Sequence, residues 1–410
     1  MTLNKNYDVV FLGGLFPKEY EQDIKKYSVK NIQNAANVFQ WNLVTGLDLN
    51  LNKPIQIINS LYIGSYPKLY KKLIINTFSF SHCIGAKDIN VGFLNLWGIK
   101  NYFRYYSLKK YLKEWVLDGN KNKVIIAYAM TQTFCKAIKY IKKLNPLIKT
   151  ILVVPDLPMY MNLSNKRNIV YDYLKKLDMN SMTNKIKYID NFIFLTEYMS
   201  EKINIYNKPY TVIEGVVSKE DKDECIISDK FFKKTIAYTG TLNERYGIRI
   251  LIDAFMKVKI DDVEMIICGN GDSEKYITDM SIIDSRIIYL GAISRKDSVK
   301  LQKRATLLVN PRPTNEDYTR YSFPSKNMEY MASGTPVLTT KLPGMPEEYY
   351  NYVFLIEDES VDGIAKALTE VLENTNEKMC EVGSRARNFV LKHKNNKIQT
   401  KKIIDMLNNT

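Results

Sequence analysis

Residues 320–340 read Arg320-Tyr-Ser-Phe-Pro-Ser-Lys-Asn-Met-Glu-Tyr-Met-Ala-Ser-Gly334-Thr-Pro-Val-Leu-Thr340, and no other part of the chain says as much about its structure. They predict a loop, a helix with Pro324 at its first position and Gly334 as its stop, and then a buried strand. The first turn of a helix has unpaired N–H groups and a positive dipole end. Because Lys326 lies in that turn and Arg320 just upstream, the segment favours an anion at the helix start.

Three polar residues of this predicted helix share one face. Ser325, Lys326 and Glu329 are spaced so that their side chains meet on one side. A nucleoside diphosphate would meet Lys326 and the free N–H groups, and its ribose hydroxyls would meet the Glu329 carboxylate. The alternative is an ordinary surface helix with a Lys–Glu pair.

Length and composition indicate a soluble protein of two domains. The chain has 410 residues, of which 45% are hydrophobic and 25% charged. No apolar run approaches the roughly 18 residues of a membrane helix, and Val9–Phe16 is interpreted as a first strand rather than a signal peptide. We therefore expect a cytoplasmic protein.

Cysteine and histidine usage argues against a metal site and against a redox cofactor. The five cysteines lie far apart, and His82 and His393 are the only histidines of the sequence. We expect free thiols, no bound metal and no cofactor. Acid–base chemistry by His82 alone stays open.

The net charge of +15 lies entirely in the first half. Residues 1–217 carry 30 Lys and Arg against 15 Asp and Glu, whereas residues 218–410 carry 29 of each. This asymmetry favours an anionic partner for the first domain, such as a membrane surface, a lipid diphosphate or nucleic acid. Charge that only keeps the protein soluble is the alternative.

Apolar runs and helical patterns alternate through both halves, which predicts α/β domains with parallel sheets and ligands at the carboxyl ends of the strands. We expect one domain over 1–217, a second over 218–393 and a C-terminal basic amphipathic helix near Lys394–Leu407. The predicted strands are Tyr7–Leu12, Pro54–Asn59, Val124–Tyr128, Thr150–Val154, Asn191–Leu195, Lys208–Ile213, Lys234–Thr239, Val263–Cys268, Arg286–Leu290, Leu307–Asn310, Pro336–Thr339 and Tyr352–Ile356. The predicted helices include Val29–Leu43, Ile248–Val258, Val361–Glu373 and Cys380–His393.

Glycines follow two predicted strands of the second domain. Gly240 and Gly247 flank one turn, and Gly269-Asn-Gly271 forms another, as a phosphate pocket or any α/β corner requires. No Gly-x-Gly-x-x-Gly fingerprint and no phosphate-loop motif occur, which disfavours a nicotinamide oxidoreductase.

Two charged residues follow other strands. Arg312, in Asn310-Pro-Arg-Pro313, has a planar fork that suits a phosphate or a sugar, or it caps a turn. Asp156, held between two prolines, would bind sugar hydroxyls or an acceptor, or bond its own backbone.

Three further motifs favour their structural interpretations. Thr196-Glu197 is expected to cap a helix rather than to act in catalysis. Asp221-Lys-Asp223-Glu224, with a metal-like spacing, is expected to be a solvated linker. The run Tyr102–Trp115 could stack nucleic-acid bases, but its apolar spacing also fits an amphipathic helix on a core or a membrane.

Residues 234–375 resemble the nucleotide-sugar domain of family 4 retaining glycosyltransferases. The resemblance is carried by Tyr238-Thr-Gly-Thr-Leu242 with Gly247, by Ile266-Ile-Cys-Gly-Asn-Gly-Asp272 and Leu290-Gly291, and by Ser322–Val337. The Phe-Pro-Ser-Lys variant is similar to enzymes that build bacterial exopolysaccharide, capsule or O-antigen. Asn34–Asn37, Phe39-Gln40, Val154–Pro158, Leu195-Thr196 and Ile213–Gly215 resemble the acceptor-side domain more loosely.

The resemblance implies a GT-B fold, in which two doubly wound Rossmann-like domains face each other and the C-terminal helix crosses back to the first. It implies a metal-independent, retaining transfer from a nucleoside-diphosphate sugar, with a UDP-sugar as the expected donor. The acceptor would be an oligosaccharide or linked to polyprenyl diphosphate, with the enzyme peripheral on the membrane. By its motif it assigns the donor ribose to Glu329, the diphosphate to Ser325 and Lys326, and the lining of their pocket to Gly240. From their places after strands and turns we also expect Thr241, Gly269, Gly271 and Ile288 to bind the donor, and we expect Lys326, Glu329, Arg312 and Asp156 to act in the reaction.

The chain departs from the family pattern in two places. The first glutamate of the family's Glu-x7-Glu pattern is replaced by Tyr321, which leaves the contacts to the transferred sugar open. The usual Arg and Lys after the first strand are missing, and Thr241 or Leu242 and Tyr246 stand near their places. We therefore expect Lys326 and Arg312 to supply the positive charge.

Two other functions remain possible from the sequence. A nucleotide-sugar epimerase shares the architecture and would form its product without an acceptor. A nucleic-acid-binding protein would bind oligonucleotides with steep salt dependence, but would leave Ser322–Val337 unexplained, so no nucleic-acid partner is expected.

Overall fold

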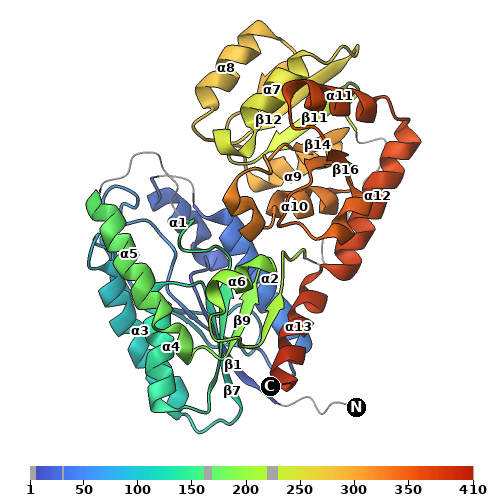
Figure 1. The fold of residues 1–410 in the computed structure, drawn as a ribbon. Coiled ribbons are helices and arrows are strands. Elements are labelled where there is room, and N and C mark those ends of the chain that lie inside the picture. The colour runs from blue at the N-terminus through green and yellow to red at the C-terminus, as the bar shows by residue number, and fades with distance from the viewer. Residues whose placement is uncertain (1–5, 30–31, 161–168, 219–229, 410) are drawn as a thin grey trace. The chain divides into compact units, whose positions relative to one another are not determined.

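The computed structural model describes residues 6–29, 32–160, 169–218 and 230–409, with the backbone alone for 169–175. The chain divides into two compact units (Figure 1). Unit 1 comprises Met1–Val216 with Asn396–Thr410, and unit 2 comprises Val217–Asn395. The expected boundary after residue 217 lies one residue from this division.

Unit 1 is built on an eight-stranded sheet in the order β10-β9-β8-β7-β1-β2-β5-β4. All neighbours pair in parallel except β4 and β5, which pair antiparallel, as do β3 and β6 in a separate ribbon. The strands are β1 Asp8–Gly13, β2 Gln56–Asn59, β3 Ile74–Ile75, β4 Phe78–Phe80, β5 Asp88–Asn90, β6 Phe93–Leu94, β7 Lys123–Tyr128, β8 Lys149–Val154, β9 Asn191–Phe194 and β10 Tyr210–Val212.

The connections of unit 1 are mostly helical, as parallel strands require. The helices are α1 Glu21–Tyr27, α2 Asn34–Asn50, α3 Lys100–Leu117, α4 Gln132–Leu144, α5 Ile169–Thr183, α6 Tyr198–Ile203 and α13 Asn396–Asn408, with short 3₁₀ turns at Lys18–Tyr20 and Ile186–Tyr188. The Thr131 hydroxyl starts α4 by accepting a hydrogen bond from the Phe134 N–H at 3.3 Å.

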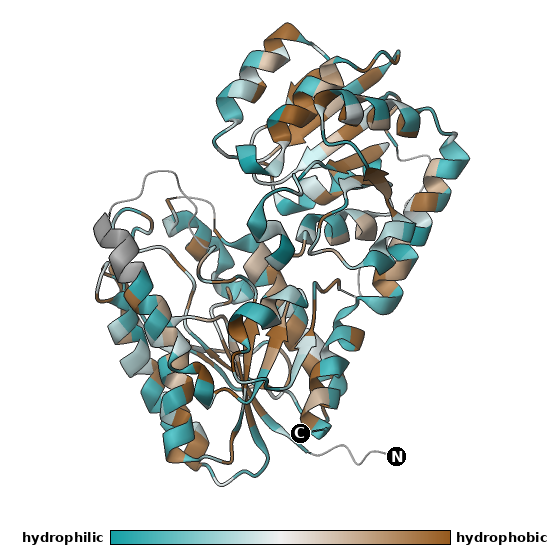
Figure 2. Ribbon diagram, in the orientation of Figure 1, coloured by the Kyte–Doolittle hydropathy of each residue, from teal (hydrophilic) through white to brown (hydrophobic). Residues whose placement is uncertain are grey.

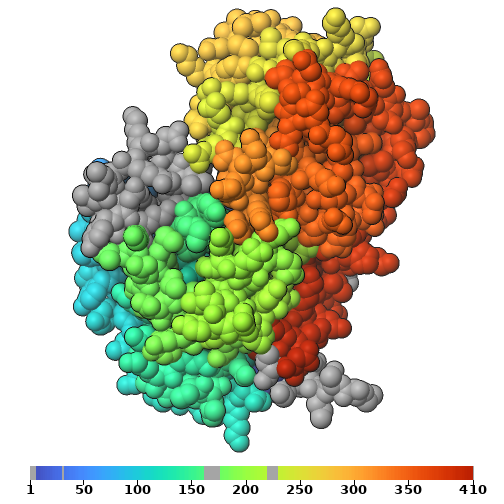
Figure 3. Space-filling view, viewed as in Figure 1, coloured from blue at the N-terminus to red at the C-terminus, as the bar shows by residue number. Residues whose placement is uncertain are grey.

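The C-terminal helix α13 belongs to unit 1, although its sequence follows unit 2. Ile403 and Leu407 are buried in the same apolar cluster as the strands β1 and β7. The Gln399 amide donates to Glu214 Oε2 and to the Gly215 carbonyl, both at 3.1 Å. In Figure 3 the red atoms of α13 lie beside the yellow-green atoms of the β10 region. The predicted return of the last helix to the first domain is confirmed.

Unit 2 contains a six-stranded, fully parallel sheet in the order β13-β12-β11-β14-β15-β16. The strands are β11 Lys234–Thr239, β12 Val263–Cys268, β13 Ile287–Tyr289, β14 Leu307–Asn310, β15 Val337–Thr340 and β16 Phe354–Ile356. The helices are α7 Ile248–Met256, α8 Glu274–Ile283, α9 Arg295–Arg304, α10 Ser325–Ser333, α11 Val361–Leu372 and α12 Asn376–His393, with 3₁₀ turns at Glu244–Tyr246, Asp317–Tyr321 and Glu347–Tyr352.

Apolar residues concentrate on the strands of each sheet, and polar residues face outward on the helices (Figure 2). All six residues of β7 are buried. In β12 five of six are buried, and only Glu264 is partly exposed. Continuous apolar runs are typical of strands with helices on both faces. The continuous apolar runs of the sequence were therefore enough to predict these strands.

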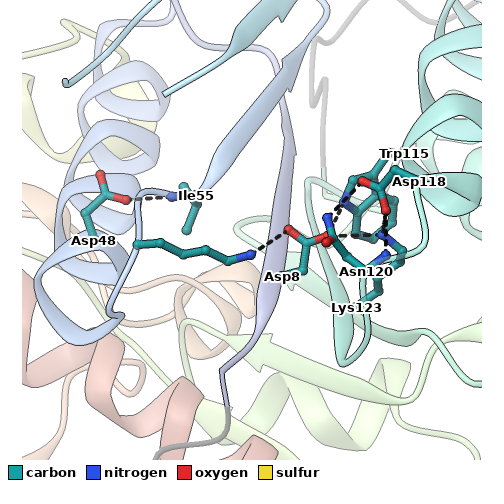
Figure 4. Close-up of polar contacts among 8 residues, drawn as sticks. Asp8, Asp48, Ile55, Trp115, Asp118, Asn120 and Lys123 are labelled. Atoms are coloured by element: carbon teal, nitrogen blue, oxygen red, sulfur yellow. Dashed lines mark hydrogen bonds and ion pairs between the residues drawn. The ribbon is translucent and has the colours of Figure 1, made fainter. Parts of the chain in front are cut away.

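The start of the β1 strand is held by a buried ion-pair group (Figure 4). The Asp8 carboxylate accepts from Lys123 Nζ at 3.1 Å, from Trp115 Nε1 at 3.1 Å and from Lys53 Nζ at 3.4 Å. The buried Lys123 ammonium also pairs with Asp118. Because Lys123 begins β7, this group ties the amino ends of β1 and β7 together.

Several predicted details were wrong. Pro324 is not the first residue of its helix but caps it, while Gly334 ends the helix as predicted, with φ 81°. The helix predicted from Val29 begins at Asn34 and runs to Asn50. The β3–β6 ribbon and β5 were not predicted, because strands of two or three residues leave no periodicity to detect.

Candidate functional site

The candidate site lies at the carboxyl ends of β11 and β14 in unit 2. Within the sheet, β12 and β13 lie on one side of β11. The chain then crosses back, and β14, β15 and β16 lie on the other side of β11. At such a reversal two neighbouring loops diverge and leave a crevice, which is where open parallel sheets bind ligands. The Gly240 turn follows β11, and the loop leading to α10 follows β14.

The turns after β11 and β12 pack against each other through glycine. A Cβ on Gly269 would stand 1.7 Å from the Gly240 carbonyl oxygen, and its φ is 139°, so only glycine fits. A Cβ on Gly271 would stand 2.2 Å from the Leu242 carbonyl oxygen. The Gly240 N–H donates to the Cys268 carbonyl at 2.9 Å. These contacts hold the Gly240 turn in one place.

Lys326 lies directly over Gly240. A Cβ on Gly240 would stand 3.3 Å from Lys326 Cε, so the absent side chain leaves the room that the lysine uses. Lys326 Nζ lies 3.2 Å from Glu329 Oε1, one turn further along α10. The structure therefore brings together the three residues that the sequence placed on a glycine turn and on one helix face.

Glu329 is positioned by a residue that the sequence did not predict. Gln302, from α9, is 1% exposed and donates from Nε2 to Glu329 Oε1 at 2.6 Å and to Thr239 Oγ1 at 2.8 Å. Thr239 is the last residue of β11, and its backbone N–H donates to the buried Tyr330 hydroxyl at 2.9 Å. The carboxylate is thus linked to the end of the central strand.

The electrostatic surroundings keep Glu329 ionised. Burial favours the protonated form, but the Lys326 ammonium, the Gln302 hydrogen bond and the charge of Arg295 outweigh it and lower the pKa of Glu329 below its ordinary value. Both hydrogen bonds use Oε1. Oε2 is left without a protein partner in the part of the chain that the structure describes.

Helix α10 is anchored to the strands on either side of its loop. Asn327 Oδ1 accepts from Asn310 Nδ2 at 2.7 Å, and Asn327 Nδ2 donates to Thr339 Oγ1 at 3.0 Å. Asn310 ends β14 and Thr339 lies in β15. This buried amide pair sets the position of the helix start relative to the carboxyl edge of the sheet.

Arg312 takes a different environment from the one expected of a free phosphate ligand. Its guanidinium lies 4.7 Å from the Tyr246 ring centre and 5.1 Å from that of Tyr318, and Nη1 donates weakly to Ser322 Oγ at 3.5 Å. Burial raises the pKa of the Tyr238 hydroxyl, and the positive charge of Arg312 offsets part of this rise. That hydroxyl would lie 3.6 Å from a Cβ on Gly240. Arg312 is therefore near the Gly240 turn but stacked between tyrosines.

The remaining donor-side predictions are distributed around this centre. Ser325 is exposed at the start of α10, and its N–H donates to the Phe323 carbonyl at 2.9 Å. Thr241 is exposed in the Gly240 turn. Ile288 pairs with Ile266 of β12, one strand away from β11. Tyr321 is buried in a 3₁₀ turn that precedes α10.

The other predicted positions lie outside unit 2 or outside the described residues. Asp156 is an exposed residue of unit 1 and follows β8. Glu197 occupies the cap position of α6, but its carboxylate accepts from the Tyr210 hydroxyl at 2.9 Å and makes no cap hydrogen bond. The pair Thr196-Glu197 therefore supplies the cap position as predicted, but Glu197 makes no side-chain cap hydrogen bond. Asp221, Asp223 and Glu224 lie outside the described residues.

His82 is part of an ion-pair cluster in unit 1. Its Nδ1 lies 2.6 Å from Asp88 Oδ2 and its Nε2 lies 2.9 Å from Asp48 Oδ2. Burial lowers the pKa of His82, but the two carboxylates outweigh it and raise the pKa to about 9. Cys83 adds a sulfur within 4.8 Å of Asp48 and His82 ligand atoms. Since a carboxylate lies within hydrogen-bond distance of each ring nitrogen, His82 links Asp88 of β5 to Asp48 of α2.

The described cysteines are free, as expected: Cys83, Cys135, Cys268 and Cys380. The predicted residues that meet in unit 2 are Gly240, Lys326 and Glu329, while Gln302 and Arg295 were missed. Nothing in the α9 sequence distinguishes Gln302 from its polar neighbours, because its partners lie on β11 and α10. Within the described residues, the site offers two ammonium N–H groups on Lys326 and one carboxylate oxygen on Glu329 that no protein group uses.

Comparison with known proteins finds a family model that matches most of unit 2. Residues 226–389 match the model of the glycosyl transferases group 1. The phosphatidyl-myo-inositol mannosyltransferase of Mycobacterium leprae is 30% identical over 112 residues, which cover 27% of this chain. The match spans 29% of that protein, so less than a third of the relative's length is represented.

Solved structures resemble the chain over nearly its whole length. Sucrose-phosphate synthase from Thermosynechococcus elongatus has a TM-score of 0.66 at 14% identity, covering 98% of both chains. HepE from Anabaena, solved in complex with UDP, has a TM-score of 0.64 at 13% identity, covering 98% of this chain and 100% of that one. The lipopolysaccharide outer core galactosyltransferase WaaB has a TM-score of 0.62 at 14% identity, covering 98% and 99%. At these identities the likeness establishes the fold, and it confirms the predicted GT-B class.

Proposed function

We propose that the protein transfers a sugar from a nucleoside diphosphate to a saccharide acceptor, a proposal supported by the match of residues 226–389 to the glycosyl transferases group 1. The donor nucleotide is UDP, which is the ligand of the structurally similar HepE complex. The acceptor is a growing or lipid-linked saccharide of a cell-surface polysaccharide. The observation that carries the proposal is the Lys326 ammonium over Gly240, 3.2 Å from Glu329, at the strand reversal of unit 2.

The donor diphosphate is assigned to the start of α10. Lys326 uses one of its three N–H groups on Glu329, so two remain for phosphate oxygens. The exposed Ser325 adds a hydroxyl, and the helix dipole favours an anion there. Gly240, Thr241, Gly269 and Gly271 form the turns against which the diphosphate rests.

The ribose of the donor is assigned to Glu329. An ionised carboxylate accepts hydrogen bonds from two neighbouring hydroxyls, and Oε2 has no protein partner among the described residues. The lowered pKa keeps this acceptor charged at neutral pH. Ile288, in β13 on the far side of β12 from β11, is assigned to the base side of the pocket.

Stabilisation of the leaving diphosphate drives the reaction. As the bond from the sugar's anomeric carbon to the phosphate oxygen breaks, negative charge develops on that oxygen, and Lys326 and the positive end of the α10 dipole stabilise it. The acceptor hydroxyl attacks from the same face, forms the new glycosidic bond and gives its proton to the departing phosphate. The configuration is retained, and neither a histidine base nor a metal ion takes part.

Two further residues have proposed roles in this reaction. Asp156 of unit 1 orients the acceptor hydroxyl. Arg312, held between Tyr246 and Tyr318, adds positive charge near the Gly240 turn rather than a direct fork to phosphate. With tyrosine at position 321, the transferred sugar meets a phenol where the family pattern has a carboxylate.

The protein is proposed to work in the cytoplasm at the surface of an anionic membrane. Its net charge of +15 lies in residues 1–217. The chain from Leu96 to Tyr106 leaves large apolar side chains exposed, among them Trp97 at 78%. Basic charge with exposed aromatics suits an anionic lipid surface. Among the described residues, no helix meets the length and apolarity of a membrane span.

A transfer assay tests the proposal. Purified protein is incubated with UDP-sugars, with and without an extract of lipid-linked saccharides, and release of UDP and the anomeric configuration of the product are measured. We expect transfer with retention, and Lys326→Ala should lower turnover by roughly two orders of magnitude or more. Lys366→Ala, on an exposed face of α11, is the matched control. Near-normal transfer by Lys326→Ala would remove that residue from the mechanism, and an epimer formed from donor alone would favour an epimerase.

A further inference from the structure

Unit 1 contains two neighbouring cations that the proposed transfer mechanism does not use. Lys100 is the first residue of α3 and Arg104 lies one turn later, so both project from one face of the helix. Arg104 is 7% exposed. In the described part of the chain, neither forms an ion pair with a carboxylate, although buried cations are ordinarily paired with one.

The partners of both cations are neutral and incomplete. Arg104 donates from Nε to Ser60 Oγ at 2.8 Å and from Nη2 to the Ser60 carbonyl at 2.6 Å, which uses two of its five N–H groups. Lys100 Nζ donates to the Ile63 carbonyl at 2.9 Å, which uses one of three. Five N–H donors on two adjacent cations are therefore left for another acceptor.

Positive charge is concentrated here at an energetic cost. The Arg104 guanidinium lies 5.4 Å from the ring centres of Tyr62 and Phe93, which offsets part of its desolvation. Burial, and then the charge of Arg104, lower the pKa of Lys100 to about 8. The first turn of α3 has no acidic residue, and its cap residue, Ile99, makes no side-chain hydrogen bond. A bound anion would remove this cost.

The cations lie at the edge of the sheet where a ligand is expected. Ser60 directly follows β2, and its N–H donates to the carbonyl of Gly13, the last residue of β1. The strand order of unit 1 reverses at β1, since β2 lies on one side and β7 on the other. Lys100 and Arg104 thus reach the carboxyl edge beside the reversal point, as Lys326 does in unit 2.

The start of α3 and the turn before it carry an apolar surface beside the cations. Leu96, Trp97, Ile99, Tyr102, Phe103 and Tyr106 are each between 38% and 78% exposed. The rings of Tyr102 and Tyr106 pack at a tilt of 44°, with their centres 4.4 Å apart. The two cations, which have no carboxylate partner among the described residues, suit the phosphate of a phosphorylated lipid, and the exposed apolar surface beside them suits its chain.

We propose that Lys100 and Arg104 bind the phosphate head of a lipid whose chain lies along the exposed apolar residues of α3. The inference deepens the proposed function, because the bound lipid phosphate would belong to the acceptor. The Arg104 fork and the Lys100 ammonium share the phosphate oxygens, and Ser60 holds the guanidinium in place.

Pyrophosphate titration of the full-length protein under saturating UDP tests the site. UDP occupies the unit 2 site, so calorimetry then reports pyrophosphate binding elsewhere. We expect a second binding event that Lys100→Ala weakens about ten- to a hundredfold, the range of one charge-assisted hydrogen bond. Because removing Arg104 also breaks its bonds to Ser60, the half-exposed Lys100 carries the test. Lys113→Ala, an exposed lysine of the same helix, is the control and should change the affinity less than twofold, a margin of about 0.4 kcal/mol.

Vesicles distinguish a lipid phosphate from a soluble one. Phosphatidylcholine vesicles with phosphatidic acid should bind the protein more strongly than vesicles with phosphatidylserine at matched total charge, and Lys100→Ala should abolish this preference. A protein that binds UDP but shows no second pyrophosphate site would overturn this inference alone. So would an equal loss in Lys113→Ala. Pyrophosphate binding without preference for phosphatidic acid would overturn the lipid assignment and leave a soluble phosphate. Failure to bind UDP would instead count against the proposed function.

Discussion

Replacing Gln302 with alanine tests whether recognition of the nucleotide depends on a residue outside the glycine turns and α10. Gln302 is fully buried and donates to Glu329 at 2.6 Å, to Thr239 at 2.8 Å and to Ser298 at 3.2 Å. A hydrogen bond to an ionised group contributes about 1.5–3 kcal/mol, and a neutral one about 0.5–1.5 kcal/mol. Gln302→Ala should therefore lower the free energy of unfolding by roughly 2–4 kcal/mol.

The functional consequence should fall on the ribose and not on the diphosphate. Without Gln302 the Glu329 carboxylate loses its fixed orientation, while Lys326 over Gly240 is retained. We expect UDP to bind roughly tenfold more weakly, which corresponds to about 1.4 kcal/mol, and pyrophosphate to bind to unit 2 almost unchanged. The ratio of the two affinities, measured by calorimetry, is the quantity that decides.

A destabilised control and a pH series separate positioning from general damage. Leu368→Ala removes a buried side chain of the α11 helix and should cost about 2–5 kcal/mol in stability without changing the affinity ratio. Gln302 is also one of the groups that lower the pKa of Glu329. In Gln302→Ala, UDP affinity should therefore begin to fall at a higher pH than in the native protein as the solution is acidified. Equal loss of UDP and pyrophosphate affinity would refute the reasoning.

Three further outcomes follow from the same contacts. The pKa of His82 is raised to about 9, so the stabilisation by its carboxylate partners should be complete below pH 6.5 and disappear as pH rises through 9. Thermal melts from pH 6 to 10 should show this loss of stability, and the melting temperature of His82→Gln should depend less on pH. Lys123→Ala should lower the free energy of unfolding by about 1–3 kcal/mol, because it removes the buried ammonium that Asp8 and Asp118 share while Asp8 keeps Lys53 and Trp115; the exposed Lys121→Ala should change little, and equal effects would exclude the ion-pair group as a source of stability. Gly240→Ala should fold normally but bind UDP more weakly in calorimetry, since its Cβ meets only the flexible end of Lys326. Gly269→Ala should fail to fold stably, since its Cβ would meet backbone at 1.7 Å; a well-folded Gly269→Ala and an unfolded Gly240→Ala in circular dichroism would contradict this.

The sequence was sufficient for features that depend on local pattern. Continuous apolar runs predicted the parallel strands, and the alternation of strands and helices predicted two α/β units. Gly334 has the left-handed conformation that a helix stop requires. The meeting of Lys326 and Glu329 follows from three-residue spacing on one helix.

Features that depend on tertiary contacts were not predictable. Gln302 and Arg295 act on Glu329 from α9, and no spacing within that helix indicates which residue faces α10. Arg312 was expected to be a phosphate ligand because of its place after a strand, but Tyr246 and Tyr318 surround it through contacts distant in sequence. The cation pair of α3 appeared in the sequence only as part of a basic aromatic run, because its partners Ser60 and Ile63 lie some forty residues earlier.

Titration of the native protein with UDP tests the central assignment most directly. The account predicts binding at one site in unit 2, competition by pyrophosphate, and an affinity for UDP that Lys326→Ala lowers roughly ten- to a hundredfold while Lys366→Ala leaves it unchanged. Absence of binding by UDP and by the other nucleoside diphosphates would contradict it, as would a complex in which the diphosphate lies away from Lys326 and Gly240.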